Sequence, residues 1–299
     1  NHGTSEDFAD MAQHDQESAQ PTHRPSKRLP VRRTRPGRSP RGLDEVAVEE
    51  PLEIRLRWVD DDGSHDELIG TTMRTPGDDF DLAVGFLVAE GLLSPGDVPA
   101  GISHCTEGDV EDPLNVVTAT LRNGSKPDIS SVARVGLGTS ACGICGRTRM
   151  EDVIARVPQV SEKQDFDPAW LATLPEQLRA AQSLFESTGG VHAAGAWPAG
   201  AQVITVREDV GRHNALDKLI GSLASRDQLP ATGLVCAVSG RASFELVQKA
   251  AVAGFDALIA VGAPSSLAVE TARGAGMILC GFAGNAGLNC YSGASRLGL

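Results

Sequence analysis

Long hydrophobic runs are missing from this sequence of 299 residues. No stretch of 18 or more apolar residues is present to span a bilayer as a helix. The N-terminus also lacks the order of charged, apolar and small residues that marks a secretion signal. We therefore expect a cytoplasmic protein that does not bind membranes.

Cysteine is also scarce, and only Cys142 and Cys145 of the six cysteines lie close together in the sequence. Six is too few for the disulfide framework of a secreted domain, which favours a reducing compartment. The fingerprints G-x-G-x-x-G and G-x-x-x-x-G-K-[ST] are absent too. Their absence argues against dinucleotide redox chemistry and ATP hydrolysis.

Acidic residues are missing from one short basic segment. Residues 24–41 carry eight basic side chains and no acidic one, whereas residues 42–299 carry 19 basic and 34 acidic ones. An acidic body argues against general nucleic-acid binding. The basic segment could contact nucleic acid, a membrane or an acidic partner. Its prolines and few apolar residues instead favour a disordered basic leader at residues 1–42, outside the fold.

The rest of the sequence divides into three parts. Residues 43–125 alternate apolar with polar residues around one amphipathic helix near Leu82 to Gly91, which predicts a small α+β domain. Residues 126–150 form a glycine-rich cysteine loop. Residues 151–299 begin with helical segments that start at Pro168 and Pro175, and we expect this part to bind a ligand.

Short apolar segments alternate with helical ones in the last part of the chain. We expect strands near residues 203–206, 234–238, 257–261 and 277–281, with helices near 213–223, 244–253 and 266–273. This alternation predicts an α/β layered domain with a largely parallel sheet. Ligands bind outside the carboxyl ends of such strands, which places residues 239–241 and 262–266 at two neighbouring ligand-facing turns.

The strongest chemical motif is Cys142-Gly143-Ile144-Cys145 in its glycine-rich surroundings. Two thiols at this spacing can share a metal, form a disulfide or pass a sulfur atom between them, and spacing alone does not choose. A structural zinc site needs four ligands, and the sequence has no second C-x-x-C, so His104, Cys105 or His192 would have to supply the others. A thioredoxin-like cysteine pair lies at the start of a helix, and the glycines around Cys142 and Cys145 disfavour a helix there.

A sulfur carrier needs a thiolate, which Arg147 or Arg149 would favour by lowering the thiol pKa. The outer sulfur of a persulfide can pass to an acceptor while the second thiol attacks the inner sulfur and closes a disulfide. A role in sulfur transfer thus explains two cysteines rather than one.

Polar residues crowd a second motif, VREDVGRHNALDKLIG, at the junction of a predicted strand and helix. A capped helix start with surface ion pairs would explain them. The functional alternative is a pocket rim on which Arg212, His213 and Asn214 hold an anionic ligand.

Two serine-containing turns supply further candidates for an anion site. Ser239 and Arg241 follow one predicted strand, and Ser265 and Ser266 follow the next. Each turn alone is weak evidence, because serine also caps ordinary helices. Together they favour a ligand with phosphate groups, bound at the helix N-termini.

Together these blocks resemble the formate dehydrogenase accessory sulfurtransferase family. The matching stretches span roughly residues 43–292 and are TPGDDFDLAVGFLVAEGL, SACGICGR, TGGVHAAG, EDVGRHNALDKLIG, SGRASFELVQKAAVAGF and VGAPSSLAVETARGAGMILCGF. The family pattern has an arginine after the last strand, whereas this sequence has Gly284 and Gly287 there. A phosphate contact of the family is therefore missing here or supplied from elsewhere.

The resemblance implies that Cys142 and Cys145 receive persulfide sulfur from a cysteine desulfurase. It implies transfer to the molybdenum cofactor, bis-molybdopterin guanine dinucleotide, for formate dehydrogenase, the recipient. It further implies a homodimer whose C-terminal domain resembles the cytidine deaminase fold and binds the guanine nucleotide portion. His192 stands where a deaminase has its histidine, but Ala194 replaces the catalytic acid and no P-C-x-x-C follows, which disfavours deamination.

Two rival functions stay open at this point. One is a chaperone that binds and inserts the molybdenum cofactor without sulfurating it, and the other is a dithiol redox enzyme. The sequence gives no resident metal site.

Overall fold

The structure is a computed structural model of the chain. It describes residues 23–34, 41–105, 112–122 and 164–299, together with the single positions 127, 129 and 157. The predicted cysteine loop, with Cys142 and Cys145, lies outside the described residues.

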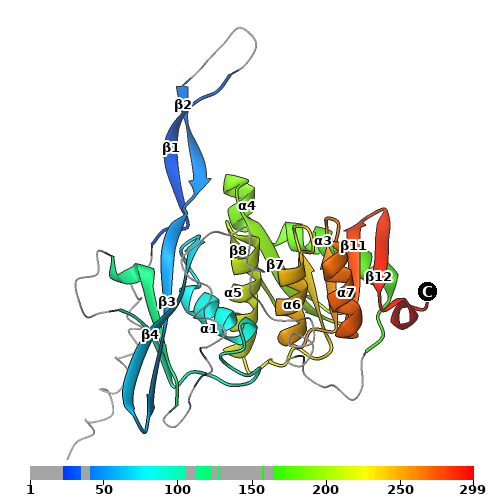
Figure 1. The fold of residues 1–299 in the computed structure, drawn as a ribbon. Helices are drawn as coiled ribbons and strands as arrows, with labels where there is room; N and C mark the ends of the chain where they lie inside the picture. Colours follow the sequence, from blue (N-terminus) through cyan, green and yellow to red (C-terminus); the bar gives the residue numbers. More distant parts are fainter. Residues whose placement is uncertain are drawn as a thin grey trace, which may run out of the picture.

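A six-stranded sheet forms the centre of the C-terminal part, in the order β12-β11-β10-β9-β7-β8 (Figure 1). Its strands are β7 His192–Pro198, β8 Thr205–Asp209, β9 Leu234–Val238, β10 Ala257–Ala260, β11 Ile278–Gly284 and β12 Gly287–Ser292. Strands β9, β10 and β11 are parallel, whereas β7 is antiparallel to β8 and β9, and β12 is antiparallel to β11. The sheet is therefore mixed rather than largely parallel as predicted.

Helices cover both faces of this sheet. α3 Pro168–Ala180 contacts one face, and α5 Arg212–Ala224, α6 Phe244–Val252 and α7 Ser266–Gly274 lie on the other (Figure 1). The short helix α4 Ser183–Thr188 follows α3. The predicted α/β layers are confirmed, and their two apolar cores flank the sheet.

One helix boundary differs from the prediction because of a proline. Pro175 does not open a second helix but lies inside α3. Leu171, Leu174 and Leu178 continue through it on one buried face. Burying a leucine contributes about 1.5–3 kcal/mol, so three of them offset the roughly 3 kcal/mol that an interior proline costs.

A second, four-stranded sheet lies in the N-terminal part, in the order β4-β3-β6-β5. Its strands are β3 Glu50–Asp60, β4 Gly63–Arg74, β5 Gly101–His104 and β6 Val116–Thr120, and a 3-10 turn, Pro113–Asn115, precedes β6. Helix α1 Asp79–Ala89 follows β4 and lies between this sheet and α5 (Figure 1). This matches the predicted α+β composition of the segment.

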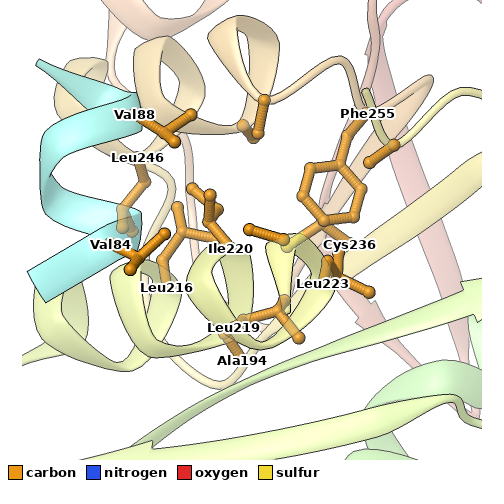
Figure 2. Close-up of a cluster of buried hydrophobic side chains, with 14 of the residues drawn as sticks. Val84, Val88, Ala194, Leu216, Leu219, Ile220, Leu223, Cys236, Leu246 and Phe255 are labelled. Atoms are coloured by element: carbon orange, nitrogen blue, oxygen red, sulfur yellow. The ribbon is translucent and has the colours of Figure 1, made fainter. Parts of the chain in front are cut away.

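Helices α1 and α5 join the two parts through an unusually close contact. A Cβ atom on Gly85 would overlap the carbonyl of Asp217, and a Cβ atom on Gly221 would overlap the carbonyl of Asp81. Only glycine lets the two backbones approach this far. Figure 2 shows the apolar side chains beside this contact, with Val84 and Val88 of α1 facing Leu216, Ile220 and Leu246.

Two further strands form a hairpin that extends from the body (Figure 1). β1 Ser26–Arg32 pairs antiparallel with β2 Arg41–Ala47, and the N–H of Val48 donates to the carbonyl of Pro25 at 2.8 Å. Strand β1 lies within the segment that we expected to be disordered, so that expectation is wrong for residues 26–32. The hydroxyl of Ser26, which donates to Glu45 at 2.6 Å, adds a side-chain bond to the ladder.

The chain ends in a 3-10 turn, Ala294–Leu297. Its Arg296 pairs with the buried Asp256 at 3.0 Å and ties the chain end to the C-terminal sheet. No helix in the described ranges combines the length and the apolar character needed to cross a bilayer.

Candidate functional site

The two predicted ligand-facing turns lie side by side at the carboxyl ends of β9 and β10. The N–H of Gly262 donates to the carbonyl of Gly240 at 3.0 Å, and the N–H of Ser265 donates to the carbonyl of Ala242 at 3.1 Å. Parallel pairing of β9 with β10 places the turns there. The prediction that they are neighbours is confirmed.

Each turn leads directly into a helix N-terminus. Ser243 caps α6, and Ser265 caps α7 by accepting a hydrogen bond from the N–H of Ala268 at 3.2 Å. Ser265 therefore performs the ordinary role of a helix cap. Ser266, the first residue of α7, is exposed. The two N-termini present backbone N–H groups and partial positive charge at one edge, which suits an anion.

Two arginines at the same edge have no partner among the residues that the structure describes. Arg241 follows β9 and is exposed, and Arg212 begins α5. Neither guanidinium forms a hydrogen bond or an ion pair with any residue that the structure describes, in contrast to Arg74 and Arg207, which bind carboxylates. Both cations are available to an anionic ligand.

His213 connects the start of α5 to the start of α6. Its Nε2 lies 3.1 Å from a carboxylate oxygen of Glu245 and 3.4 Å from the hydroxyl of Ser243. The His213 ring lowers the pKa of the half-buried Glu245 by a hydrogen bond and by its charge. We call Arg212, His213 and the turns at residues 239–243 and 262–266 the rim.

A cavity of about 600 Å³ adjoins the rim on the α3 side of the sheet. The lining residues that the structure describes are Pro175, Glu176, Leu178, Arg179, Gln182, Phe185, Gly189, Gly190, Val191, His192, Ser239, Val261, Gly284 and Asn285. Of the predicted site residues that the structure describes, Ser239 alone lines this cavity, and its hydroxyl accepts a hydrogen bond from the N–H of Ala193 at 2.9 Å. Gly284, one of the two glycines in the region where the sequence resemblance implied an arginine, forms part of the wall.

His192 lies where the cavity meets the rim. A Cβ atom on Gly240 would be 3.6 Å from its Nδ1. Partial burial lowers the pKa of His192, and the charges of Arg212 and His213 lower it further. The imidazole is therefore neutral near pH 7 and can both donate and accept a hydrogen bond.

The wall that α4 contributes is held by Glu208, one of the polar residues of the second motif. Its carboxylate accepts hydrogen bonds from the N–H groups of Leu184 and Phe185, each at 2.9 Å. The cavity residues of α3 and α4, such as Arg179 and Phe185, were not predicted from the sequence. They carry no recognisable motif, and only the fold brings them to the sheet.

Asn214 is not part of the rim. It is buried, and its amide donates to the carbonyl of Met73 at 2.7 Å and to Asp209 at 3.2 Å, while its oxygen accepts from the hydroxyl of Thr72 at 3.0 Å. These bonds attach the end of β4 to the start of α5. The polar groups of the Asn214 side chain are thus occupied by protein partners rather than turned toward the rim.

Asp209 and Lys218 complete this buried contact. Their side chains are 2.8 Å apart and almost fully buried. Asp209 also accepts from the N–H groups of Thr75 and Gly211, at 3.0 and 2.8 Å, and Lys218 donates to the carbonyl of Thr75 at 2.7 Å. We call Asp209, Asn214, Lys218 and residues 72–75 the seam.

No group of three or more histidine, cysteine, aspartate or glutamate side chains within the described ranges is placed to hold a metal ion. At the rim these ranges present two helix N-termini and two arginines, and a cavity with a mixed polar and apolar lining lies beside them. Cys142 and Cys145, the predicted sulfur-carrying residues, lie outside the described residues.

Comparisons with known proteins identify one protein family. Residues 47–298 match the family described as FdhD/NarQ. The "Sulfur carrier protein FdhD" of Streptomyces avermitilis is 43% identical over 286 residues, covering 92% of this chain and 97% of the relative. The protein of the same name from Mycobacterium tuberculosis is 42% identical over 265 residues, covering 85% of this chain and 92% of the relative.

A solved structure has a similar fold. It is that of a proposed formate dehydrogenase accessory protein from Desulfotalea psychrophila, with a TM-score of 0.67 and 22% sequence identity. The match covers 91% of this chain and 99% of the other. The likeness to the cytidine deaminase fold is not tested by these matches and stays a prediction.

Proposed function

Because the chain belongs to the FdhD/NarQ family, we propose that it is a sulfur carrier protein that serves formate dehydrogenase. The names of its relatives support the carrier role, and the description of the Desulfotalea protein as a formate dehydrogenase accessory protein supports the link to that enzyme. The sequence motif Cys142-x-x-Cys145 supplies the thiols that such a role requires.

The proposed reaction has two steps. A cysteine desulfurase first transfers a sulfur atom to one thiolate, which becomes a persulfide. The second thiolate then attacks the inner sulfur, a disulfide forms between Cys142 and Cys145, and the outer sulfur leaves with its electron pair for the acceptor. A thiol reductant of the cell must reopen the disulfide before the next cycle.

The proposed acceptor is the molybdenum cofactor, bis-molybdopterin guanine dinucleotide, which enters as substrate. The observation that carries this part is the rim, where two helix N-termini lie beside two arginines that pair with no residue in the described ranges. This arrangement fits the pyrophosphate groups of a nucleotide. Arg212, His213, Arg241, Ser265 and Ser266 would hold these phosphates, and Ser239 and His192 would face the adjoining part of the ligand. We further propose a cytoplasmic homodimer.

The test is intact-mass spectrometry of the full chain after incubation with a cysteine desulfurase and cysteine. We expect an adduct of about 32 Da, the mass of one sulfur atom, on the wild-type protein. Cys142→Ser or Cys145→Ser should remove or reduce it, whereas the matched control Cys290→Ser, a half-buried thiol elsewhere, should keep it. An unchanged adduct in the Cys142→Ser/Cys145→Ser double variant would refute the carrier role of this pair.

The second candidate is an insertion chaperone that binds the cofactor at the rim and transfers no sulfur. The free arginines of the rim favour it as much as they favour a sulfur carrier. The double cysteine variant separates the two, because a chaperone would still restore formate dehydrogenase activity in cells that lack the wild-type protein. A dithiol redox enzyme would instead show the disulfide without any sulfur adduct.

A further inference from the structure

Two cysteines at the edge of the C-terminal sheet, Cys280 and Cys290, lie directly opposite each other on neighbouring strands. Cys280 belongs to β11 and Cys290 to β12, and the antiparallel register pairs the two residues. Both are free thiols in the structure. Neither belongs to the C-x-x-C motif, so the proposed function leaves this second pair of thiols without a role.

An extra residue in β12 produces the pairing. Leu279 pairs with Ser292, but the next residue, Cys280, pairs with Cys290, so the register shifts by one residue at Tyr291. In a regular ladder Tyr291 would lie opposite Cys280. A β-bulge redirects a side chain in this way, and here it places a thiol where a tyrosine ring would otherwise lie.

The two thiols also face the same apolar core, the one that contains the buried leucines of α3. Cys280 is fully buried in this core, and Cys290 packs against it from the edge strand. Burial raises the pKa of the Cys280 thiol, and the charge of Cys290 and a hydrogen bond with it raise this pKa further. The sulfur atoms are therefore neighbours, as their backbones are.

The backbone spacing suits a covalent bond between them. Residues opposite each other in an antiparallel ladder have Cα atoms about 4.5–5.5 Å apart, and a disulfide bridges Cα atoms about 4.4–6.8 Å apart. The strands need not move for the bond to form. Cys236 on β9 differs, because its neighbours across the sheet are Leu258 and Ala196 and its side chain belongs to the opposite core.

The two thiols differ in access to solvent. Cys290 is half-buried on β12, the last strand of the sheet, whereas Cys280 is fully buried. A small oxidant therefore meets Cys290 first. An oxidised cysteine that has a thiol beside it condenses to a disulfide, and one without such a neighbour continues to the irreversible sulfinic acid. The position of Cys280 thus provides the partner that makes oxidation reversible.

We propose that Cys280 and Cys290 form a reversible disulfide that fastens edge strand β12 to β11 when the protein meets a peroxide. The sulfur of Cys290 attacks one oxygen of hydrogen peroxide, the O–O bond breaks, and a sulfenic acid and one water form. The sulfur of Cys280 then attacks the sulfenic sulfur, the S–O bond breaks, and the hydroxyl leaves as water with the thiol proton of Cys280. The two thiols lose two electrons, the peroxide becomes two waters, and a thiol reductant reverses the bond. This inference is independent of the proposed function.

The test is peptide mapping of the full chain after treatment with hydrogen peroxide. The protein is quenched with acid, alkylated with iodoacetamide under denaturing conditions and digested with trypsin without reduction. Cleavage after Arg273 and Arg296 releases residues 274–296, a single peptide that contains both cysteines. We expect this peptide without alkyl groups and about 2 Da lighter than its dithiol form, and dithiothreitol before alkylation should restore two alkyl groups. The internal control is the peptide of residues 227–241, whose Cys236 should stay alkylated.

The unfolding temperature gives an independent measurement. A disulfide that closes the short loop of residues 280–290 should raise it by roughly 4–8 °C on oxidation. Cys280→Ala and Cys290→Ala should each abolish this rise, and the matched control Cys236→Ala should keep it. The pair Cys142 and Cys145 is present in all of these proteins, so its own oxidation contributes equally. A doubly alkylated peptide after peroxide treatment, or a sulfinic acid at Cys290 beside an alkylated Cys280, would refute the proposal. A rise that persists in Cys290→Ala would refute the role of this disulfide in fastening β12.

Discussion

The seam and the rim both take residues from the stretch 208–218, yet these residues differ in burial and in their hydrogen-bond partners. In residues 208–218, the side chains of Asp209, Asn214 and Lys218 are buried, and hydrogen bonds link them to residues 72–75. Arg212, from the same stretch, binds no described residue. Polar residues that already bind protein groups stabilise the fold, and polar residues that lack such partners are available for a ligand.

This difference follows from helix geometry. Asn214 and Lys218 are four positions apart and therefore lie on the same face of α5, which turns toward the end of β4. Arg212 and His213 precede them in the first turn and lie at the open edge of the sheet. A dense run of polar residues in a sequence can thus contain two unrelated functions, and their helical phase separates them.

The strongest way to test the comparison is to break the ion pair of the seam. Lys218→Met leaves the carboxylate of Asp209 buried without its cation, so we expect the free energy of unfolding to fall by about 3–5 kcal/mol. Urea unfolding followed by circular dichroism measures this change. The matched control Lys27→Met, at an exposed position, should leave stability unchanged. A loss below about 1 kcal/mol for Lys218→Met would mean that the seam is not what joins the two parts.

A substitution in the rim should weaken ligand binding and leave the stability of the fold unchanged. Arg241→Ala removes an exposed, unpaired cation, so its stability should stay within about 0.5 kcal/mol of the wild type. Its affinity for GDP and for pyrophosphate should fall by about 1.5–3 kcal/mol, because a charged hydrogen bond is lost. Isothermal titration calorimetry gives both affinities. Unchanged binding would move the phosphate site away from β9.

A substitution at Asn214 should have a smaller effect on stability but separates the two regions more clearly. The sequence analysis predicted Asn214 as a ligand-binding residue, whereas in the structure its side chain belongs to the seam. Asn214→Ala should cost about 1–3 kcal/mol of unfolding free energy, since the hydroxyl of Thr72 and the carbonyl of Met73 lose their partner. The folded variant should bind GDP as the wild type does. Weaker binding without a loss of stability would return Asn214 to the ligand site.

The smallest expected effect is a pH dependence at His192, where the cavity meets the rim. Its pKa is lowered in the folded protein, so the unfolded chain takes up a proton first as the pH falls through the ordinary histidine value of about 6.5. His192 therefore stabilises the fold fully above that pH and progressively less below it. Histidine NMR titration should show a low pKa that rises when GDP binds. A pKa at or above 6.5 in the free protein would contradict this assignment.

Much of the fold could be predicted from sequence because its apolar pattern is regular. Strand β9 and helix α7 begin where the alternation of apolar segments indicated, and the two turns meet as expected. Strands β7 and β12 were not predicted. β7 is rich in alanine and glycine, and β12 is a short edge strand with a register shift, so neither carries a clear apolar period.

The candidate site was predicted only in part, for a similar reason. Arg241 and Ser265 follow strands and could be placed by the rule for parallel sheets. The cavity wall of α3 and α4 depends on which face of the sheet these helices cover, and no local pattern contains that information.

The contact between Gly85 and Gly221 has a mechanical consequence. Helix pairs usually meet through a layer of side chains that can change rotamer and so allow one helix to slide past the other. Here the main chains touch directly, and sliding would drive carbonyl groups into each other. Helix α1 therefore cannot slide along α5, and we expect heating to unfold both parts together in one cooperative transition.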